Sequence, residues 1–62
     1  MTFDELTPYH GKSVTLEDID GERYEGVAVI DDEFRDLTLY LSDGQLGLRP
    51  EEVASIEFAD EA

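Results

Sequence analysis

Alternation of apolar and polar residues between positions 19 and 41 restricts the fold of this chain more than any other feature. Within that stretch, apolar side chains recur at every second position in the segment 23–30, and leucine does so in the segment 37–41. Successive side chains of a strand point to opposite faces, so a period of two over runs of this length indicates strands. The stretch therefore predicts two strands that are separated by the acidic turn 31–36.

Turn residues divide the rest of the chain into three further short strands. Asp20-Gly21 and Asp43-Gly44 are typical of tight hairpin turns, because glycine tolerates the positive φ that such turns need. Gly26 lies inside a strand pattern, where glycine often marks a bulge or a sharp bend. The predicted strands are 13–17, 23–30, 37–41, 45–49 and 54–58.

Two short helical turns are predicted outside the strands. Thr2 and Glu5 have the spacing of a capping box, so a helical turn is expected over about residues 2–6. Pro8 ends this turn, since the residue before a proline is pushed out of the helical region. A second tight turn is expected over 50–52, because proline suits a first helical turn and the two acids after it complement the amino end.

These elements predict an all-β fold: a five-stranded small barrel over about residues 13–58 that follows the N-terminal helical turn. Closure into a barrel removes the exposed edges that an open sheet would leave. No linker or repeat divides the chain, so residues 1–62 are expected to form one domain. The side chains expected to face inward are Val14, Leu16, Val27, Val29, Leu37, Leu39, Leu41, Leu46, Leu48, Val53, Ile56 and Phe58.

The charge of the chain is strongly negative, with 17 acidic residues, 4 basic ones and a net charge of -13. Such a surface repels the phosphates of nucleic acids. Two explanations stay open. The charge can be an adaptation to high salt or to an acidic proteome, where it only keeps the protein dissolved. Alternatively, it can form an acidic face that docks a basic protein, including one that itself binds nucleic acid.

Composition also bounds the location and the site chemistry. The chain has no cysteine, which excludes disulfides and thiolate metal sites. No apolar run approaches the roughly 20 residues of a membrane span, and the N-terminus lacks the basic and apolar regions of a signal peptide. We therefore expect a cytoplasmic protein that does not act at a membrane.

Spaced glycine and acidic residues in this chain resemble the Sm-like family of small barrels. Gly21, Gly26, Asp32 and Asp36 lie in the register of the first family motif, and an apolar strand follows them. The segment 48–56 lies on the second motif, a Leu-Arg pair followed by regularly spaced apolar positions. The resemblance implies an Sm-like or SH3-like five-stranded barrel, and it implies that copies can pair through edge strands into homo-oligomers.

In the Sm-like family, these motifs form a pocket for a base of single-stranded RNA, and the resemblance places Asp32, Phe34, Asp36 and Arg49 there. Phe34 matches the side chain that stacks on the base. Asp36 stands where the family has asparagine, and Pro50 stands where it has glycine, which introduces an anion and removes a backbone donor. The chain resembles more loosely the Rho-binding antiterminator family, acidic Sm-like barrels that bind a basic protein surface and block access of RNA.

Carboxylates cluster in the turn 31–36, but no histidine, cysteine or lysine accompanies them. A solvated acidic loop is the favoured interpretation, and a small metal-dependent hydrolase that uses this cluster ranks far below it. A calcium loop around Gly21 fails, because Val27 stands where the bidentate glutamate is needed. We expect no enzyme activity, no metal site and no cofactor.

Two functional hypotheses follow from the sequence. The first is a non-enzymatic binding module whose acidic surface contacts a basic protein in transcription or RNA metabolism. The second is a divergent Sm-like protein that binds single-stranded RNA through Phe34 and Arg49. Phe34 also has a structural interpretation, as a cap over Leu37 and Leu39 of the barrel. The acidic surface in the first hypothesis comprises Asp31, Glu33, Glu51 and Glu52.

Overall fold

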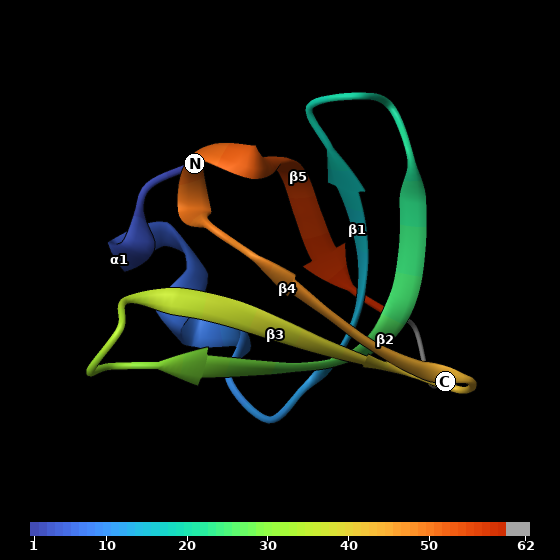
Figure 1. Ribbon diagram of the computed structural model, residues 1–62, viewed down its shortest axis with the longest axis horizontal. Coiled ribbons are helices and arrows are strands. Elements are labelled where there is room, and N and C mark those ends of the chain that lie inside the picture. Colours follow the sequence, from blue (N-terminus) through green and yellow to red (C-terminus); the bar gives the residue numbers. More distant parts are fainter. Residues whose placement is uncertain (60–62) are drawn as a thin grey trace.

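The computed structural model describes residues 1–59 of the chain (Figure 1). Five antiparallel strands and a short N-terminal helix are present, as predicted, and each predicted strand end lies within one residue of the observed end. In chain order the elements are α1 (Phe3–Leu6), the 3-10 turn η1 (Thr7–Tyr9), β1 (Ser13–Asp18), β2 (Arg23–Asp31), β3 (Asp36–Leu41), β4 (Gly44–Leu48), the 3-10 turn η2 (Pro50–Glu52) and β5 (Val53–Phe58).

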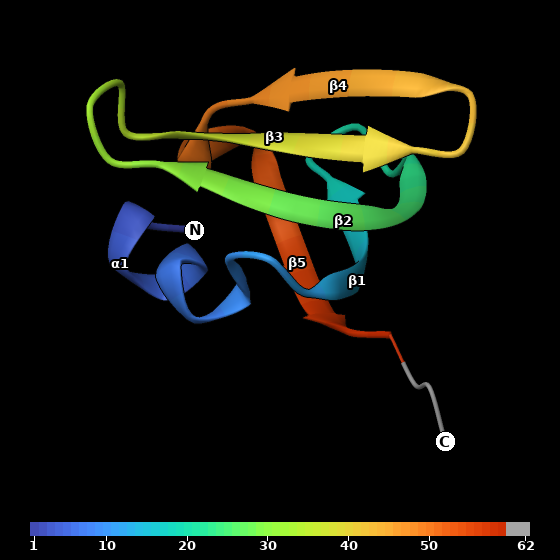
Figure 2. The same cartoon turned by 90° about the horizontal axis from the view of Figure 1, so that it is seen from below.

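The strands form one open antiparallel sheet in the order β4-β3-β2-β1-β5. β4 pairs with β3 and β5 pairs with β1, so β4 and β5 are the two edges of this sheet. The prediction of a closed barrel is therefore wrong. The reason lies in η2, which redirects the chain after β4, so that β5 crosses the direction of β4 and does not run beside it (Figure 2).

β2 is a curved strand that joins two halves of the sheet (Figure 1). Its residues 23–27 pair with β1, and its residues 27–31 pair with β3. Gly26 lies just before this change of partner. A Cβ atom on Gly26 would overlap the backbone carbonyl of Tyr40, so glycine is what allows β3 to approach β2 this closely. The bend predicted at Gly26 is confirmed.

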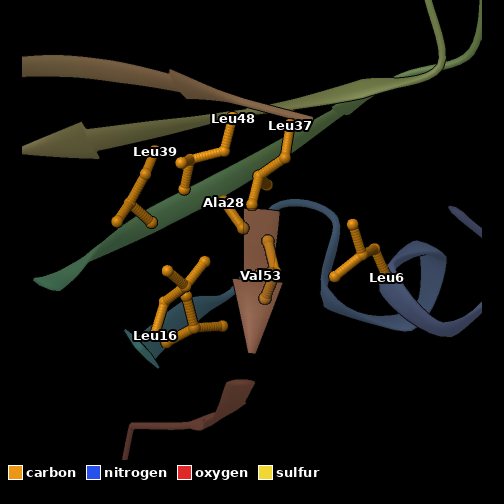
Figure 3. Packing of buried hydrophobic residues seen from close by; sticks show 8 residues of the cluster. Leu6, Leu16, Ala28, Leu37, Leu39, Leu48 and Val53 are labelled. Carbon is orange, nitrogen blue, oxygen red and sulfur yellow. The ribbon is translucent and has the colours of Figure 1, made fainter. Parts of the chain in front are cut away.

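A small core of apolar side chains fills the inner side of the bent sheet (Figure 3). α1 covers part of this core, because its two apolar residues are buried and Leu6 points towards Val53 (Figure 3). A helix of 4 residues is too short to be stable alone, so this packing is what holds α1. The buried residues are Phe3, Leu6, Val14, Leu16, Ala28, Leu37, Leu39, Leu48 and Val53.

The inward face of β2 differs from the prediction. Ala28 is fully buried and Ile30 packs against the core, whereas Val27 is 39% exposed and Val29 lies on the same outer face. The prediction that Val27 and Val29 face inward is therefore wrong. Both alternate sets of this strand are apolar, so alternation cannot choose between the two faces; the pairing of Ala28 with the buried Leu39 does.

The end of β5 also differs from the prediction. Phe58 was expected to face inward, but its side chain is 56% exposed. Its ring lies 4.6 Å from the ring of Tyr9, measured between centroids. Phe58 pairs with Val14 near the start of β1, so it lies at the end of β5 on the same side of the sheet as the buried Val14. The residue therefore closes the rim of the core and not its centre.

The predicted caps and turns are present, but the prediction that Pro8 stops the helical backbone is wrong. Thr7 keeps the right-handed helical conformation, with φ -58° and ψ -33°, and the chain continues as η1 because proline fits the first turn of a helix. Thr2 and Glu5 form the capping box of α1, in which each side chain accepts a hydrogen bond from the backbone N–H of the other. Gly21 has a φ of 88°, the left-handed conformation that its hairpin position predicts. None of the helical segments within residues 1–59 has the length and apolar composition that a membrane crossing requires.

Candidate functional site

The β2–β3 hairpin holds three of the four predicted binding residues: Asp32 and Phe34 lie in its loop, and Asp36 is the first residue of β3. Asp31, the last residue of β2, determines the shape of this loop. The Oδ1 atom of Asp31 accepts hydrogen bonds from the backbone N–H groups of Glu33, at 2.8 Å, and Phe34, at 3.0 Å. This Asx turn satisfies both backbone donors locally. Arg35 completes the loop in the left-handed region, with a φ of 55°. The loop is therefore an ordered turn.

Phe34 presents its ring to solvent. The side chain is 72% exposed, and Leu37 and Leu39 are fully buried among the other core residues without its help. The interpretation of Phe34 as a cap over the barrel is therefore wrong. A large apolar ring on an ordered loop loses little conformational freedom when it is covered, and aromatic residues of this kind are enriched at binding hot spots.

Arg35 connects this loop to α1. Its guanidinium carbon lies 4.3 Å from the centroid of the Phe3 ring, which is within the range of a cation–π contact worth about 0.5–1 kcal/mol at an exposed site. The sequence does not predict this role. The only signal was a single basic residue in an otherwise acidic turn, and the partner on α1 could be recognised only after folding.

Arg49 lies at the same end of the sheet as Asp36, but it faces another neighbour. Leu37 pairs with Leu48, so Asp36 and Arg49 occupy the next positions along β3 and the chain after β4. The Nε of Arg49 donates to Glu51 Oε2 at 3.2 Å, with both side chains at least 70% exposed. An ion pair this exposed contributes little stability. Within residues 1–59, no ion pair joins Arg49 to the loop acids.

The two acids of η2 have different partners: Glu51 pairs with the Arg49 side chain, and Glu52 binds a backbone group. The backbone N–H of Arg49 donates to Glu52 Oε1 at 2.8 Å, which closes the start of η2. The amino group of Met1 donates to the carbonyl oxygens of Pro50 and Val53, at 3.2 and 3.0 Å. These contacts place α1 directly beside η2.

The loop, α1 and η2 therefore gather at one end of the molecule (Figures 1 and 2). α1 adds two exposed acids that the sequence analysis did not include. None of the charged residues in the described part of the chain is buried. We call this set the acidic end: Asp4, Glu5, Asp31, Asp32, Glu33, Asp36, Glu51 and Glu52.

The carboxylates of the acidic end are spread over α1, η2 and the β2–β3 hairpin. Among residues 1–59, no group of three or more histidine, cysteine, aspartate or glutamate side chains is arranged to hold a metal ion. Two surface hollows, of about 100 and 450 Å³, lie elsewhere, along β1 and β5. The smaller is lined by Thr15, Leu16, Glu17, Arg23, Ser55, Ile56 and Glu57, and the larger by Gly11, Lys12, Ser13 and Phe58.

His10 has a structural role that the sequence does not predict. It is exposed, as expected of a loop residue. However, its Nδ1 atom accepts a hydrogen bond of 2.9 Å from the backbone N–H of Ile30. Gly11 and Lys12 pair with Ala28 through backbone hydrogen bonds immediately before this contact. The imidazole therefore takes the place of the next backbone carbonyl in the ladder along β2.

Burial and the carboxylates of the turn between β1 and β2 raise the pKa of Tyr24. Partial burial of the phenol is the largest cause, and the carboxylates of Asp18, Glu22 and Asp20 follow in that order. Both effects disfavour a negative phenolate. Asp18 also shapes the turn, because its Oδ1 accepts from the N–H groups of Asp20 and Glu22, each at 2.9 Å.

Comparison with protein-family models, with curated proteins and with solved structures finds no match to this chain. What the structure and these comparisons establish together is a small domain of five antiparallel strands with an N-terminal helix. The resemblance to the Sm-like family therefore rests on the spacing of Gly21, Gly26, Asp32 and Asp36 and on the segment 48–56.

Proposed function

We propose that this chain is a non-enzymatic binding module whose acidic end contacts a basic protein in transcription or RNA metabolism. One observation supports this most directly: the Phe34 ring is 72% exposed and is held by the Asp31 turn among unburied carboxylates. An exposed aromatic ring surrounded by acids matches arginine in two ways. The guanidinium group stacks on aromatic faces and also forms hydrogen bonds with carboxylates.

The Sm-like architecture is part of this proposal. Its support is the motif spacing, the N-terminal helix, the bend of β2 at Gly26 and the short η2 turn between β4 and β5. The looser resemblance to the Rho-binding antiterminator family is the reason for choosing transcription or RNA metabolism as the setting. Under this proposal, the two edges of the sheet remain available for pairing with other chains.

Binding of single-stranded RNA through Phe34 and Arg49 is the second candidate. The exposure of both side chains favours it. The charge of the site opposes it, because Asp36 stands beside these positions and Arg49 is already paired with Glu51. Carboxylates close to a phosphate backbone weaken binding, since the main favourable contribution to RNA affinity comes from contacts of lysine and arginine side chains with the phosphates.

Fluorescence anisotropy with two labelled probes separates the candidates. One probe is an arginine-rich peptide and the other is a short oligouridylate, both measured at about 0.15 M salt, where the Debye length of about 8 Å leaves contact electrostatics intact. We expect the peptide to bind and the oligouridylate to bind negligibly. Phe34→Ala should weaken peptide binding about five- to tenfold, as the loss of one cation–π contact predicts.

Ile19→Ala is the matched control, because Ile19 is also a large exposed apolar residue, at 64%, but lies in the β1–β2 turn. It should bind the peptide as the wild type does. Equal binding by Phe34→Ala and Ile19→Ala would mean that charge alone attracts the peptide. Oligouridylate binding that both Phe34→Ala and Arg49→Ala abolish would favour the RNA candidate instead.

A further inference from the structure

The outer face of β2, β3 and β4 has a central area without charged side chains, although the whole chain has a net charge of -13. Directly paired residues of antiparallel strands project to the same side of a sheet. Two rows cross these strands on the side opposite the core, and every residue in them is neutral. We call them the neutral face: Val27, Tyr40 and Gln45 in one row, and Val29, Thr38 and Gly47 in the other.

The neutral face is open to solvent. Val27 is 39% and Tyr40 45% exposed, and Gln45 and Gly47 are exposed on the edge strand β4. Isolated apolar residues on a surface are ordinary. A continuous neutral area that includes an aromatic ring is different, because binding surfaces commonly have an uncharged centre in which aromatic residues are enriched.

Gly47 provides an independent indication that something approaches this face. A Cβ atom on Gly47 would meet no atom within 4 Å, and its φ is not positive. Neither packing nor backbone conformation therefore requires glycine. Glycine in the interior of a strand is destabilising, by roughly 0.5–1 kcal/mol relative to alanine in regular structure, and it often marks a place where another chain comes close. Gly47 leaves the backbone of β4 uncovered beside Thr38.

Carboxylates border the neutral face at both ends. Asp31 and Asp36 form the next cross-strand pair beyond Val29 and Thr38, and Arg49, which follows beside Asp36, is paired with Glu51. At the other end, Glu25 precedes Val27 by one outward position, and Asp43 lies in the hairpin turn that joins β3 to β4. A neutral centre between two acidic borders is complementary to a segment with apolar residues in its middle and basic residues at both ends.

We propose that the neutral face is the docking surface for a basic protein segment, with the apolar side chains of that segment over Gly47 and Tyr40 and its basic side chains at the acidic borders. This inference rests on the proposed function, because it assigns to the same basic partner a second contact surface that continues from the acidic end through Asp31 and Asp36. The Phe34 loop and the neutral face then form one continuous interface.

A second copy of this chain does not fit the same surface. A symmetric pair brings the same patch of both copies together, so the acidic borders of one copy would lie close to those of the other. Each copy also carries a net charge of -13, which opposes association at moderate salt. A nucleic acid would meet the same borders with its phosphates. The charge complementarity selects a basic protein.

The test uses two peptide probes and the complete chain. The first probe has two arginines on each side of a central Leu-Val pair, and the second has a central Ser-Ser pair between the same arginines. Two-dimensional NMR of the 15N-labelled wild type maps where each peptide binds. We expect the Leu-Val peptide to shift the amide signals of the neutral face and to bind about tenfold more tightly than the Ser-Ser peptide, since burying one large apolar side chain contributes that much.

Gly47→Val fills the surface without disturbing the core, because its new side chain has open space. It should weaken binding of the Leu-Val peptide about tenfold, to the level of the Ser-Ser peptide, because the apolar side chains of the peptide can then no longer be buried. The matched control is Ser55→Val, which adds a similar branched side chain to an exposed position on the other edge strand, β5. Ser55→Val should bind both peptides as the wild type does.

The outcomes distinguish this inference from the function on which it rests. If the peptides shift only amide signals of the acidic end, and both peptides bind equally, the neutral face is not the docking surface. The proposed function would still stand. No binding of either peptide would overturn both. Neutral-face shifts that depend on protein concentration without any peptide would identify a second copy as the occupant and overturn the proposal. The map on the wild type decides these cases even if a variant does not fold.

Discussion

The two halves of the bent sheet share an inner side but differ on the outside. In the half formed by β5, β1 and the start of β2, the outward residues include four charged ones beside Thr15 and Ser55: Glu17, Arg23, Glu25 and Glu57. In the half formed by the end of β2, β3 and β4, the two rows of the neutral face are uncharged, and outward charges lie only at their borders, as at the Asp31–Asp36 pair. Both halves bury leucine, valine or alanine on the inner side, so folding requires the same of each. The difference on the outside therefore points to binding.

Two glycines show the same contrast at single positions. Gly26 is required for the fold, because β3 approaches it too closely for any side chain. Gly47 is not required, because a side chain there would project into open space. A residue that folding demands and a residue that folding merely permits look alike in the sequence. Variants of the two positions should separate the two roles.

The largest effect is expected for Gly26→Val. The new side chain would collide with the backbone at Tyr40, and relief requires β3 to move away, so the free energy of unfolding should fall by about 3 kcal/mol or more. Gly47→Val should leave it unchanged or raise it by up to about 1 kcal/mol, because a branched residue favours a strand. Urea unfolding followed by circular dichroism measures both, and a large loss for Gly47→Val would remove the contrast.

A smaller effect is expected for His10→Ala, which acts on the half of the sheet that carries the neutral face. The substitution leaves the N–H of Ile30 without its partner, so the free energy of unfolding should fall by about 1 kcal/mol. His10→Asn is the control, since its Oδ1 atom can accept in place of Nδ1. Hydrogen exchange at the Ile30 amide should accelerate in His10→Ala and recover in His10→Asn; equal rates in both variants would show that this hydrogen bond does not protect β2.

An exchange of charge between the two outer faces should have a still smaller effect. Glu25→Gln removes repulsion and should raise the free energy of unfolding at low salt by up to about 0.5 kcal/mol, while Gln45→Glu should lower it by a similar amount. Both effects should disappear by about 1 M KCl, where the Debye length is about 3 Å. Thermal melts across KCl concentrations test this. A much larger cost for Gln45→Glu would mean that stability, and not binding, keeps the neutral face free of charge.

The smallest effect concerns Tyr24, in the charged half of the sheet. Burial and the neighbouring carboxylates raise its pKa, so the folded state holds the phenol proton longer than the unfolded chain does. Stability is therefore unaffected below the ordinary tyrosine pKa of about 10 and declines as the pH rises above it. Asp18→Asn removes one of the charges and keeps the turn acceptor, so it should lower the pKa of Tyr24. Ring signals followed by NMR across alkaline pH measure this shift, and an unchanged pKa would mean that the Asp18 charge does not act on the phenol.

The elements of this fold could be predicted from the sequence because local chemistry decides them. Period-two alternation located all five strands to within one residue at each end, and the Thr2–Glu5 spacing located α1. Gly21 takes the positive φ that its turn requires, and Gly26 marks the bend of β2. Each of these features depends on a residue and its near neighbours in the chain.

For the candidate site, the sequence identified which residues are acidic or aromatic but not how they meet. Asp31, Phe34 and Asp36 do lie together in the β2–β3 hairpin, since they are close in the chain. The contact of Arg35 with Phe3 and the meeting of that loop with α1 and η2 involve residues far apart in the sequence. No local pattern encodes such a meeting, because it depends on how the strands between them are paired.

Tertiary structure alone decided which face of β2 turns inward and whether the sheet closes. Val27 and Val29 alternate with Ala28 and Ile30, and both sets are apolar, so only the register with β3 could place Ala28 in the core. Closure depended on the direction in which η2 sends β5, which alternation does not contain. Alternation specifies which side chains share a face; pairing between distant strands specifies what that face meets, and on this chain it left the neutral face uncovered.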